Sequence, residues 1–333
     1  MPISNYFYIL QMLLLSIVLS ACGSSSSDSG PATSDVGVRF SDAPIEDLQR
    51  VVITVDKLTF SRSGEDIIVD TFTSEELNLI DSDTFQLNLL DYQGLESSLV
   101  LDSVILPVGD YQNLLIEVLD TDINETYVQE VGSEEHKALK VPSNELKLGG
   151  FTVSARSSQT FVVEFGLRHA MTYNPGPDRY ILKPRGVRVV RLADASNISG
   201  NVDLSTTSCF SAGDDSLSHI AYLYEGHALD AELLGDVFDR EIDIDVPENI
   251  IAPAVATSID ENGDYLFSYL NDGDYTVAVS CNAPSDSAAD YDEIIIPSPA
   301  GLLIELALDK ETHMTCDFIE GLEVENCSVN TSL

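Results

Sequence analysis

The strongest structural signal in the chain is the run Thr160-Phe161-Val162-Val163-Glu164-Phe165-Gly166-Leu167. Large apolar side chains occupy every second position, and Thr160, Glu164 and Gly166 lie between them. Successive side chains of a β-strand point to opposite faces. The run therefore predicts a strand with one buried face and one polar face that carries Glu164.

The same period of two recurs in most apolar segments. Examples are Leu114-Ile116-Val118, Ile242-Ile244-Val246 and Leu302-Ile304-Leu306-Leu308. Turn signals such as Asn174-Pro175-Gly176-Pro177 and Asn262-Gly263 separate the segments, and helical periodicity is scarce. The pattern predicts half-buried strands, and an all-β fold of two consecutive antiparallel β-sandwich domains.

The two domains are predicted to meet at Ala193–Asn197. Tyr180–Arg191 is predicted to be the last strand before this boundary, and Ile198–Val202 opens a new strand pattern after it. The expected divisions are a β-sandwich over residues 36–193, a second β-sandwich over residues 197–309 and a disulfide-closed C-terminal segment over residues 310–333.

An apolar leader precedes these domains. Ile9–Leu19 is uncharged and too short to cross a bilayer, which takes ~20 apolar residues. It ends in Leu19-Ser20-Ala21-Cys22, which resembles the lipobox of bacterial lipoproteins. The resemblance implies that residues 1–21 are a signal peptide and that Cys22 is lipidated. A non-cleaved or internal apolar segment is the alternative, because no Lys or Arg precedes the run.

The serine-rich residues 22–35 are predicted to form a flexible tether, because they hold little apolar surface to bury. Gly23, not Asp, follows the cysteine. By resemblance to enterobacterial lipoprotein sorting, this favours the outer membrane over retention in the inner membrane. The sequence does not indicate which leaflet of the outer membrane carries the protein. The expected contact with the membrane is the lipid anchor on Cys22.

Acidic residues outnumber basic residues 56 to 16, which gives a formal net charge of -40. Such a charge repels nucleic acid, so no nucleic-acid partner is expected. The favoured explanation is that the excess of acidic residues keeps the protein soluble. The alternative is that some of these residues bind divalent cations.

Four cysteines remain beside the predicted lipidation site: Cys209, Cys281, Cys316 and Cys327. In an exported chain an even number indicates two disulfides, for which three connectivities exist. Cys316 and Cys327 flank an acidic stretch with a turn, which favours a bond between them. Cys209 would then pair with Cys281.

Three motifs in order carry a resemblance to a known family. They are Val38-Arg39-Phe40-Ser41-Asp42-Ala43-Pro44, Leu106-Pro107-Val108-Gly109-Asp110-Tyr111 and Tyr180-Ile181-Leu182-Lys183-Pro184. Residues 36–192 resemble domain-of-unknown-function family 4382 of bacterial lipoproteins. The resemblance implies a β-sandwich on the cell envelope and supplies no activity.

A second resemblance covers residues 197–309. Asp260–Phe267 and Asp272–Val277 each contain a turn glycine followed by aromatic residues. This pattern is similar to carboxypeptidase-regulatory-like, prealbumin-type β-sandwiches. The resemblance implies an accessory domain without catalytic function.

Two acidic positions are weighed as ligand sites. Asp42 is a candidate ligand-facing carboxylate, although a cap for backbone amides at a proline-containing turn is favoured. Asp120, Asp122 and Asn124 place oxygen donors at alternate positions, as a calcium loop does. The glycine and glutamate of an EF-hand loop are missing, so a polar β-turn is favoured. No cofactor is expected, with Ca²⁺ as the alternative.

Cationic and aromatic residues gather at one place in this acidic chain: Arg168, His169, Tyr173 and Arg179. The cluster is a candidate binding surface for a carboxylate or a sugar. The favoured explanation is that the arginines of this region offset surrounding carboxylates.

The sequence carries no recognisable catalytic motif: the five histidines form no metal-binding pair, and nucleophile-elbow and nucleotide-binding loops are missing. We therefore expect a non-enzymatic, lipid-anchored envelope protein that presents a binding or assembly surface to an envelope protein or glycan. The alternatives are calcium-dependent binding of glycan or protein, and a hydrolase with paired carboxylates in an end-loop cleft.

Overall fold

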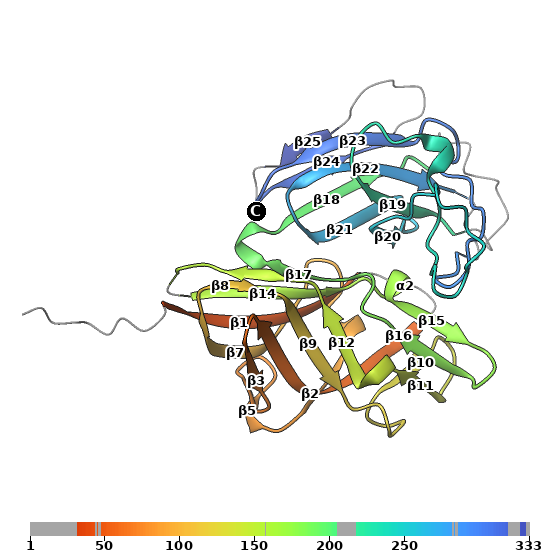
Figure 1. Cartoon of the computed structure of the whole chain (residues 1–333). Coiled ribbons are helices and arrows are strands. Elements are labelled where there is room, and N and C mark those ends of the chain that lie inside the picture. The colour runs from red at the N-terminus through yellow and green to blue at the C-terminus, as the bar shows by residue number, and fades with distance from the viewer. Residues whose placement is uncertain are drawn as a thin grey trace, which may run out of the picture. The chain divides into compact units, whose positions relative to one another are not determined.

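Two groups of sheets follow one another along the chain, separated by a short 3₁₀ helix at Leu192–Asp194 (Figure 1). The computed structural model describes residues 32–43, 45, 48–156, 158–204, 218–281, 283, 286–318 and 327–330. The predicted signal peptide, the predicted lipidation site Cys22 and Cys209 lie outside these residues. Residues from Thr33 to Leu333 belong to one compact unit. We call the strands before the 3₁₀ helix the N-terminal part and those after it the C-terminal part.

The described residues of the N-terminal part form seventeen strands. They are β1 (Thr33–Asp42), β2 (Leu48–Arg62), β3 (Glu65–Val69), β4 (Phe72–Ser74), β5 (Leu79–Ser82), β6 (Phe85–Asn88), β7 (Ser98–Pro107), β8 (Gly109–Tyr111), β9 (Asn113–Val118), β10 (Tyr127–Glu130), β11 (His136–Lys140), β12 (Glu145–Leu148), β13 (Phe151–Val153), β14 (Ser158–Phe165), β15 (Met171–Asn174), β16 (Arg179–Leu182) and β17 (Val187–Arg191). One sheet has the order β17-β14-β1-β7. A nine-stranded sheet follows the path β12-β9-β2-β10-β11-β16-β15, with β3 and β6 also paired to β2. The ribbons β13-β8 and β4-β5 complete this part.

The described C-terminal part forms two four-stranded sheets. Its strands are β18 (Ser196–Asn201), β19 (Ile220–Glu225), β20 (Val255–Ser258), β21 (Asp264–Leu270), β22 (Gly273–Ser280), β23 (Leu303–Leu308), β24 (His313–Cys316) and β25 (Cys327–Asn330). The sheet orders are β21-β18-β24-β25 and β20-β19-β22-β23. The described helices are short: α2 (Leu167–Ala170) and 3₁₀ helices at Leu89–Asp91, Pro142–Asn144, Leu192–Asp194 and Ala231–Leu233.

The all-β prediction is confirmed, and three of the alternating segments form the strands β9, β14 and β23 that their pattern predicts. Their inward side chains enter hydrophobic cores that stay within one part. The N-terminal core runs from Val36 to Val187, and the C-terminal clusters lie between Ile198 and Phe318. Aromatic rings fill the first core, where Phe40 of β1 meets Phe165 of β14 edge-on, with centroids 5.3 Å apart.

Strand direction is mixed, whereas the sequence pattern predicts antiparallel sheets throughout. Most pairs are antiparallel, but β1 runs parallel to β14, β11 parallel to β16, and β18 parallel to β24. Alternation determines which face of a strand is buried, and it carries no information about the direction of the neighbouring strand.

The first strand begins earlier than the predicted end of the tether. Residues 33–35 belong to β1, where Ser34 pairs with Leu106 and Asp35 with Ile105 of β7. Asp35 also pairs with Ser158 of β14. Backbone pairing therefore extends the strand into a stretch whose side-chain composition predicts a tether.

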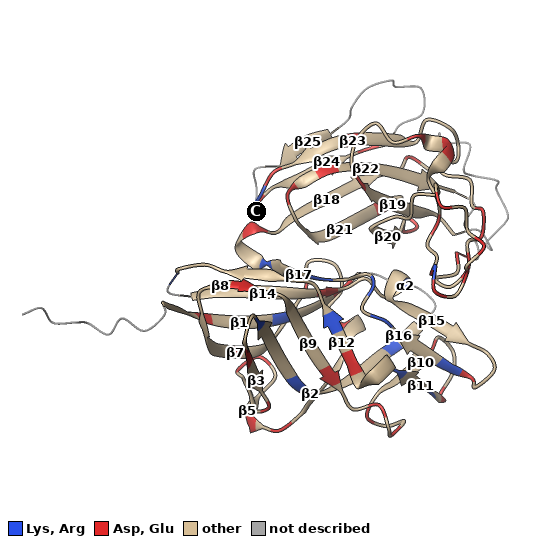
Figure 2. Cartoon of the chain, viewed as in Figure 1, with Lys and Arg blue, Asp and Glu red and all other residues tan. Residues whose placement is uncertain are grey.

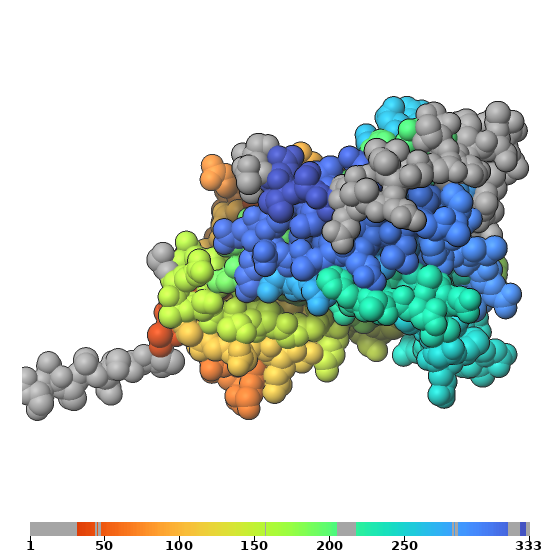
Figure 3. Space-filling model, turned by 90° about the horizontal axis from the view of Figure 1, so that it is seen from above, coloured from red at the N-terminus to blue at the C-terminus, as the bar shows by residue number. Residues whose placement is uncertain are grey.

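The segment Ile242–Val246 is not a strand, so that prediction is wrong. Asp239 and Asp243 accept hydrogen bonds from the amides of Glu241 and Asp245, which folds the chain into turns. Ile242 and Ile244 are 46% and 81% exposed. This loop belongs to the teal surface of Figure 3, and Figure 2 shows many acidic residues along it.

The predicted final strand Tyr180–Arg191 is divided in two. Its first half is β16 in the nine-stranded sheet, and its second half is β17 at the edge of the four-stranded sheet. Between them, Gly186 has a φ of 74°, a left-handed conformation that glycine adopts without steric cost.

One predicted disulfide is confirmed. Cys316 of β24 bonds to Cys327 of β25 across 11 residues. Cys281 is also disulfide-bonded, and its predicted partner Cys209 lies outside the described residues.

We expect the double variant Cys316→Ala/Cys327→Ala to lose about 3 kcal/mol of unfolding free energy, because the bond closes a short loop in the unfolded chain. Urea unfolding of the oxidised proteins measures the loss. Reduction should destabilise the wild type at least as much, and equal stability of variant and wild type would contradict a stabilising role.

Candidate functional site

The junction between the two parts centres on Glu164, which the alternating pattern places on a polar face. Its side chain is 0% exposed. The hydroxyl of Ser268, from β21 of the C-terminal part, donates a 2.9 Å hydrogen bond to its Oε1 atom. A guanidinium nitrogen of Arg188 lies 3.7 Å from the same oxygen. Burial raises the pKa of Glu164 to about 7, against the opposing effects of Arg188 and the hydroxyl groups.

Arg188 also binds the backbone of the C-terminal part. It donates to the carbonyl oxygens of Ser268 and Tyr269, at 2.6 and 3.2 Å. In the reverse direction, the Tyr269 hydroxyl donates to the carbonyl oxygen of Leu95 at 2.6 Å. These bonds satisfy groups that would otherwise be buried without partners.

A second group of contacts ties the turn between β16 and β17 to the loop after β19. Lys183 contacts Asp239 at 2.6 Å and Glu241 at 3.0 Å. Arg185 donates to the carbonyl oxygen of Phe238 at 2.6 Å and to that of Ala288. Arg185, one of the arginines expected to offset carboxylates, thus also binds backbone carbonyls across the junction.

The four residues of the predicted cationic and aromatic cluster divide into two groups. Arg168 donates to the Ser258 hydroxyl at 2.7 Å. Burial and the charge of Arg185 lower the pKa of His169 to about 4, so its ring is neutral near pH 7.

The second group lies on the β15-β16 hairpin. Tyr173 donates to Asp178 at 2.6 Å and lies under the Lys137 ammonium, 4.6 Å from the ring centroid. Arg179 pairs with Asn174 in this hairpin. A ligand role for Arg168, His169, Tyr173 and Arg179 stays a prediction.

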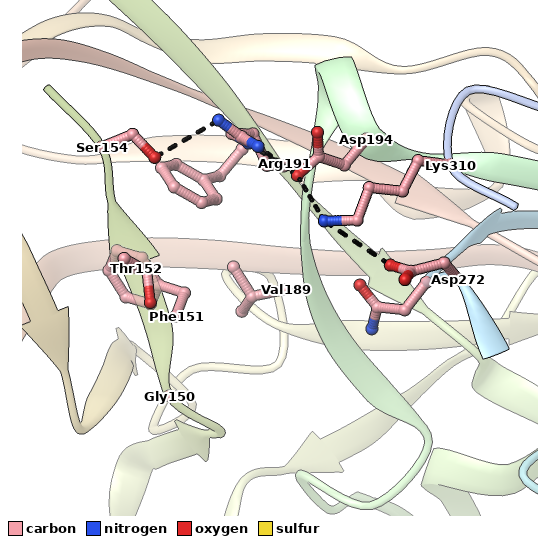
Figure 4. A pocket seen from close by; sticks show the side chains of 11 residues that line it. Gly150, Phe151, Thr152, Ser154, Val189, Arg191, Asp194, Asp272 and Lys310 are labelled. Atoms are coloured by element: carbon pink, nitrogen blue, oxygen red, sulfur yellow. Dashed lines mark hydrogen bonds and ion pairs between the residues drawn. The ribbon is translucent and has the colours of Figure 1, made fainter. Parts of the chain in front are cut away.

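A pocket of about 290 Å³ opens at the junction. We call it the junction pocket. It is lined by Gly150, Phe151, Thr152, Ser154, Phe161, Val189, Arg191, Asp194, Asn271, Asp272 and Lys310. Figure 4 shows Arg191 between Ser154 and Asp194, and Lys310 reaching towards two carboxylates. The Lys310 ammonium lies 3.5 Å from Asp194 and 3.7 Å from Asp272, and Arg191 pairs with Asp194.

The electrostatics of the junction pocket suit binding better than acid catalysis. Burial raises the pKa of Asp194, but hydrogen bonding and charge from Arg191 and Lys310 outweigh it and lower the pKa overall. Asp194 is therefore ionised at neutral pH and cannot act as a general acid. The pocket offers donors and acceptors side by side, together with an apolar wall from Phe151 and Val189.

A second hollow of about 190 Å³ shares the lining residue Asn271 with the junction pocket. It is lined by Gly186, Val187, Arg188, Leu223, Glu225, Ala254, Val255, Leu270, Asn271 and Tyr275. The junction thus presents two adjoining hollows with residues from both parts.

Asp42 is fully buried at the end of β1. Its carboxylate oxygens make no hydrogen bond of regular geometry, whereas its backbone carbonyl accepts from Gly94 at 3.0 Å. Burial, followed by the charge of Glu164, raises its pKa well above the usual range. Asp42 therefore faces the interior, close to the junction acid.

The candidate calcium loop, for which a polar β-turn is the favoured prediction, is held by protein groups. The two oxygens of Asp120 accept from the Lys140 ammonium at 2.6 Å and from the Val141 amide at 2.7 Å. Asp122 accepts from the backbone and side-chain nitrogens of Asn124, which forms a turn. Among the described residues, no group of three or more acidic, His or Cys residues is arranged to hold a metal ion.

The structure also reveals two buried acids that the sequence does not single out. Burial raises the pKa of Asp236 to about 7 and that of Asp286 to about 6. Asp236 accepts from the Ile294 amide at 2.9 Å, and Asp286 accepts from the Tyr222 hydroxyl at 2.9 Å. Their visible role is to hold loops of the C-terminal part.

Residues 33–184 match the model of a family described as Domain of unknown function (DUF4382). This confirms the resemblance of the N-terminal part, whereas the prealbumin-type resemblance of the C-terminal part stays a prediction. No curated protein matches the chain.

Several solved structures are similar at low identity. The TIE protein of Bacillus anthracis has 10% identity and a TM-score of 0.19, covering 86% of this chain. This chain spans only 33% of that protein. Shaft pilin SpaA from Lactobacillus rhamnosus has 10% identity and a TM-score of 0.20, with 86% and 96% of the two chains covered. The tip fimbrial protein Mfa3 from Porphyromonas gingivalis has 9% identity and a TM-score of 0.21, with 90% and 98% covered. These similarities are too weak to assign a function.

The buried Glu164 predicts a specific pH dependence. Its pKa is about 7 in the folded protein and near 4.5 ordinarily, so the folded state binds more protons between these values and loses stability as pH rises through them. Glu164→Gln mimics the protonated acid. From pH 4.5 to 7, wild-type unfolding free energy should fall relative to the variant by up to about 3 kcal/mol.

Urea unfolding of both proteins at several pH values measures this difference. Asp236 and Asp286 are present in both proteins, so their contributions cancel. A difference between the two proteins that stays constant with pH would show that Glu164 does not titrate in this range.

Proposed function

We propose that this protein is a non-enzymatic, lipid-anchored binding protein of the bacterial outer membrane, and that the junction pocket takes a polar ligand such as a sugar unit of an envelope glycan. The observation that carries the proposal is the pocket itself, which combines paired charges, hydroxyl groups and an apolar wall. A sugar hydroxyl both donates and accepts, so a site with both kinds of group matches it.

The contacts between the two parts support a site that is formed before the ligand arrives. Glu164, Arg188 and Ser268 hold the sheets that carry the pocket walls. A preformed site avoids part of the ordering cost of binding.

The two alternative functions receive less support. Lysine and backbone groups already occupy the oxygens of Asp120, which leaves a calcium ion to compete with them. Asp194 and Asp272 lie in one pocket, as a hydrolase requires, but Asp194 is ionised by its cationic partners. A carboxylic acid kept protonated is the usual proton donor in glycoside hydrolysis.

Membrane attachment is proposed from the lipobox-like Leu19–Cys22. The disulfide between Cys316 and Cys327 supports export, because such bonds persist in oxidising compartments.

Lys310→Ala should weaken binding of polysaccharide released from the outer membrane by about tenfold, since it removes a charged donor from the pocket. Titration calorimetry with wild type and variant measures the change. Lys147→Ala is the matched control, because this exposed lysine of β12 does not line the pocket. Equal affinity of all three proteins would contradict the pocket assignment, and cleavage of the polysaccharide would contradict a non-enzymatic role.

Cys22→Ala should move the protein from the outer-membrane fraction to the soluble fraction, because the acyl chains that hold it are lost. Gly23→Ala retains the cysteine and should stay membrane-bound. Fractionation with mass spectrometry of the N-terminal peptide checks both outcomes. Persistent attachment of the Cys22→Ala protein would refute the anchor.

A further inference from the structure

Two loops of the C-terminal part run side by side on the surface. We call residues 236–250, between β19 and β20, and residues 286–296, between β22 and β23, the paired loops. The structure describes every residue of both. The Tyr291 amide donates to Asp243 at 3.0 Å, and the Asp239 amide donates to the Ala289 carbonyl at 3.2 Å. The rings of Phe238 and Tyr291 pack edge-on, with centroids 5.6 Å apart.

Three isoleucines of the paired loops point their side chains into solvent. Ile242, Ile244 and Ile295 are 46%, 81% and 75% exposed. Their exposure contrasts with the buried apolar residues Val237, Phe238 and Ile296 in the same loops. Exposed apolar residues that gather on one surface with a polar surround are typical of protein interaction sites.

The polar surround of these isoleucines is acidic. The exposed acids are Glu241, Asp245, Glu248, Asp290, Asp292 and Glu293. Among the described residues, Lys183 pairs with Glu241, and the structure gives no ion pair to the other five. Arg240 is the one basic residue of the paired loops, and it donates to backbone carbonyls, including that of Ile250 at 3.0 Å.

The paired loops are held in place from beneath. Arg185 binds one carbonyl oxygen of each loop, those of Phe238 and Ala288. Asp236 is fully buried and accepts from the Ile294 amide, which joins the loops a second time. A partner would therefore meet a surface that is already ordered, which lowers the entropic cost of docking.

We propose that the paired loops are a docking surface for a basic amphipathic protein segment, which places apolar side chains on the isoleucines and lysine or arginine side chains among the carboxylates. Charge complementarity selects this partner, because carboxylates attract cations and steer their approach. The same charge repels anionic lipid, and a net charge of -40 disfavours a second copy of this chain.

A synthetic, fluorescently labelled amphipathic helix of lysine and leucine is the probe, and fluorescence anisotropy with the purified protein gives its Kd. Ile244→Ser/Ile295→Ser and Asp245→Asn/Glu293→Gln should each raise the Kd by about tenfold, the first through lost apolar contact and the second through lost charge. Ile80→Ser is the matched control. Ile80 is 82% exposed and precedes an acid, Asp81, but it lies in β5 of the N-terminal part.

Saturable binding that both double variants weaken and that Ile80→Ser leaves unchanged would support the proposal. Failure of the wild type to bind the peptide would overturn it, as would an equal loss in the Ile80→Ser protein. A loss in the charge variant alone would show attraction to acidic surface in general, which also overturns a docking site. All substituted side chains are exposed, and thermal unfolding of each variant verifies that it is folded.

Discussion

The burial of one carboxyl group, that of Glu164, governs how the two parts of this protein are joined. A strand with a polar face ordinarily keeps that face in water. Here β21 covers it, and the acid exchanges its hydration for the Ser268 hydroxyl and the nearby Arg188 guanidinium. Removing the Ser268 hydroxyl would take a partner from the buried Glu164 of the N-terminal part. Removing Arg188 would leave the Ser268 and Tyr269 carbonyls of the C-terminal part without this donor, so each part depends on residues of the other.

One short segment supplies most of the cations of this junction. Lys183, Arg185 and Arg188 follow one another in the turn and edge strand that end the N-terminal sheets. Each contacts carbonyl or carboxylate oxygens of the C-terminal part. Guanidinium groups suit this task because their donors lie in a fixed plane and stay charged when they are partly buried. Several of the few basic residues of this acidic chain thus connect its two parts.

The sequence predicted the local elements better than their assembly. The alternation of Leu114–Val118 and Leu302–Leu308 identified β9 and β23. A strand with one buried face can be recognised from the order of apolar and polar residues along its own segment. The same alternation failed at Ile242–Val246, because aspartate side chains there bind backbone amides and form turns. The cover over Glu164 was not predictable from its own strand, since it depends on a residue 104 positions away.

The candidate site was even less accessible to sequence reasoning. The junction pocket unites Ser154, Asp194 and Lys310, which share no motif and meet only through the contact between the parts. The cationic and aromatic residues that lie close together in the sequence divide in the structure between the junction and the outer hairpin. Spacing along a chain shows which residues share a strand face, and it does not show which sheets meet.

The position of β1 has a mechanical consequence. It lies between β14, with which it pairs from Asp35 to Asp42, and β7, with which it pairs from Thr33 to Phe40. The hydrogen bonds of the antiparallel ladder to β7 run perpendicular to the strands, and those of the parallel ladder to β14 are slanted across them. A pull on the N-terminal end of β1, along the strand axis, would therefore stress both ladders in shear and share the force among many bonds at once. Such an arrangement resists extraction of the first strand by a force applied at its N-terminal end.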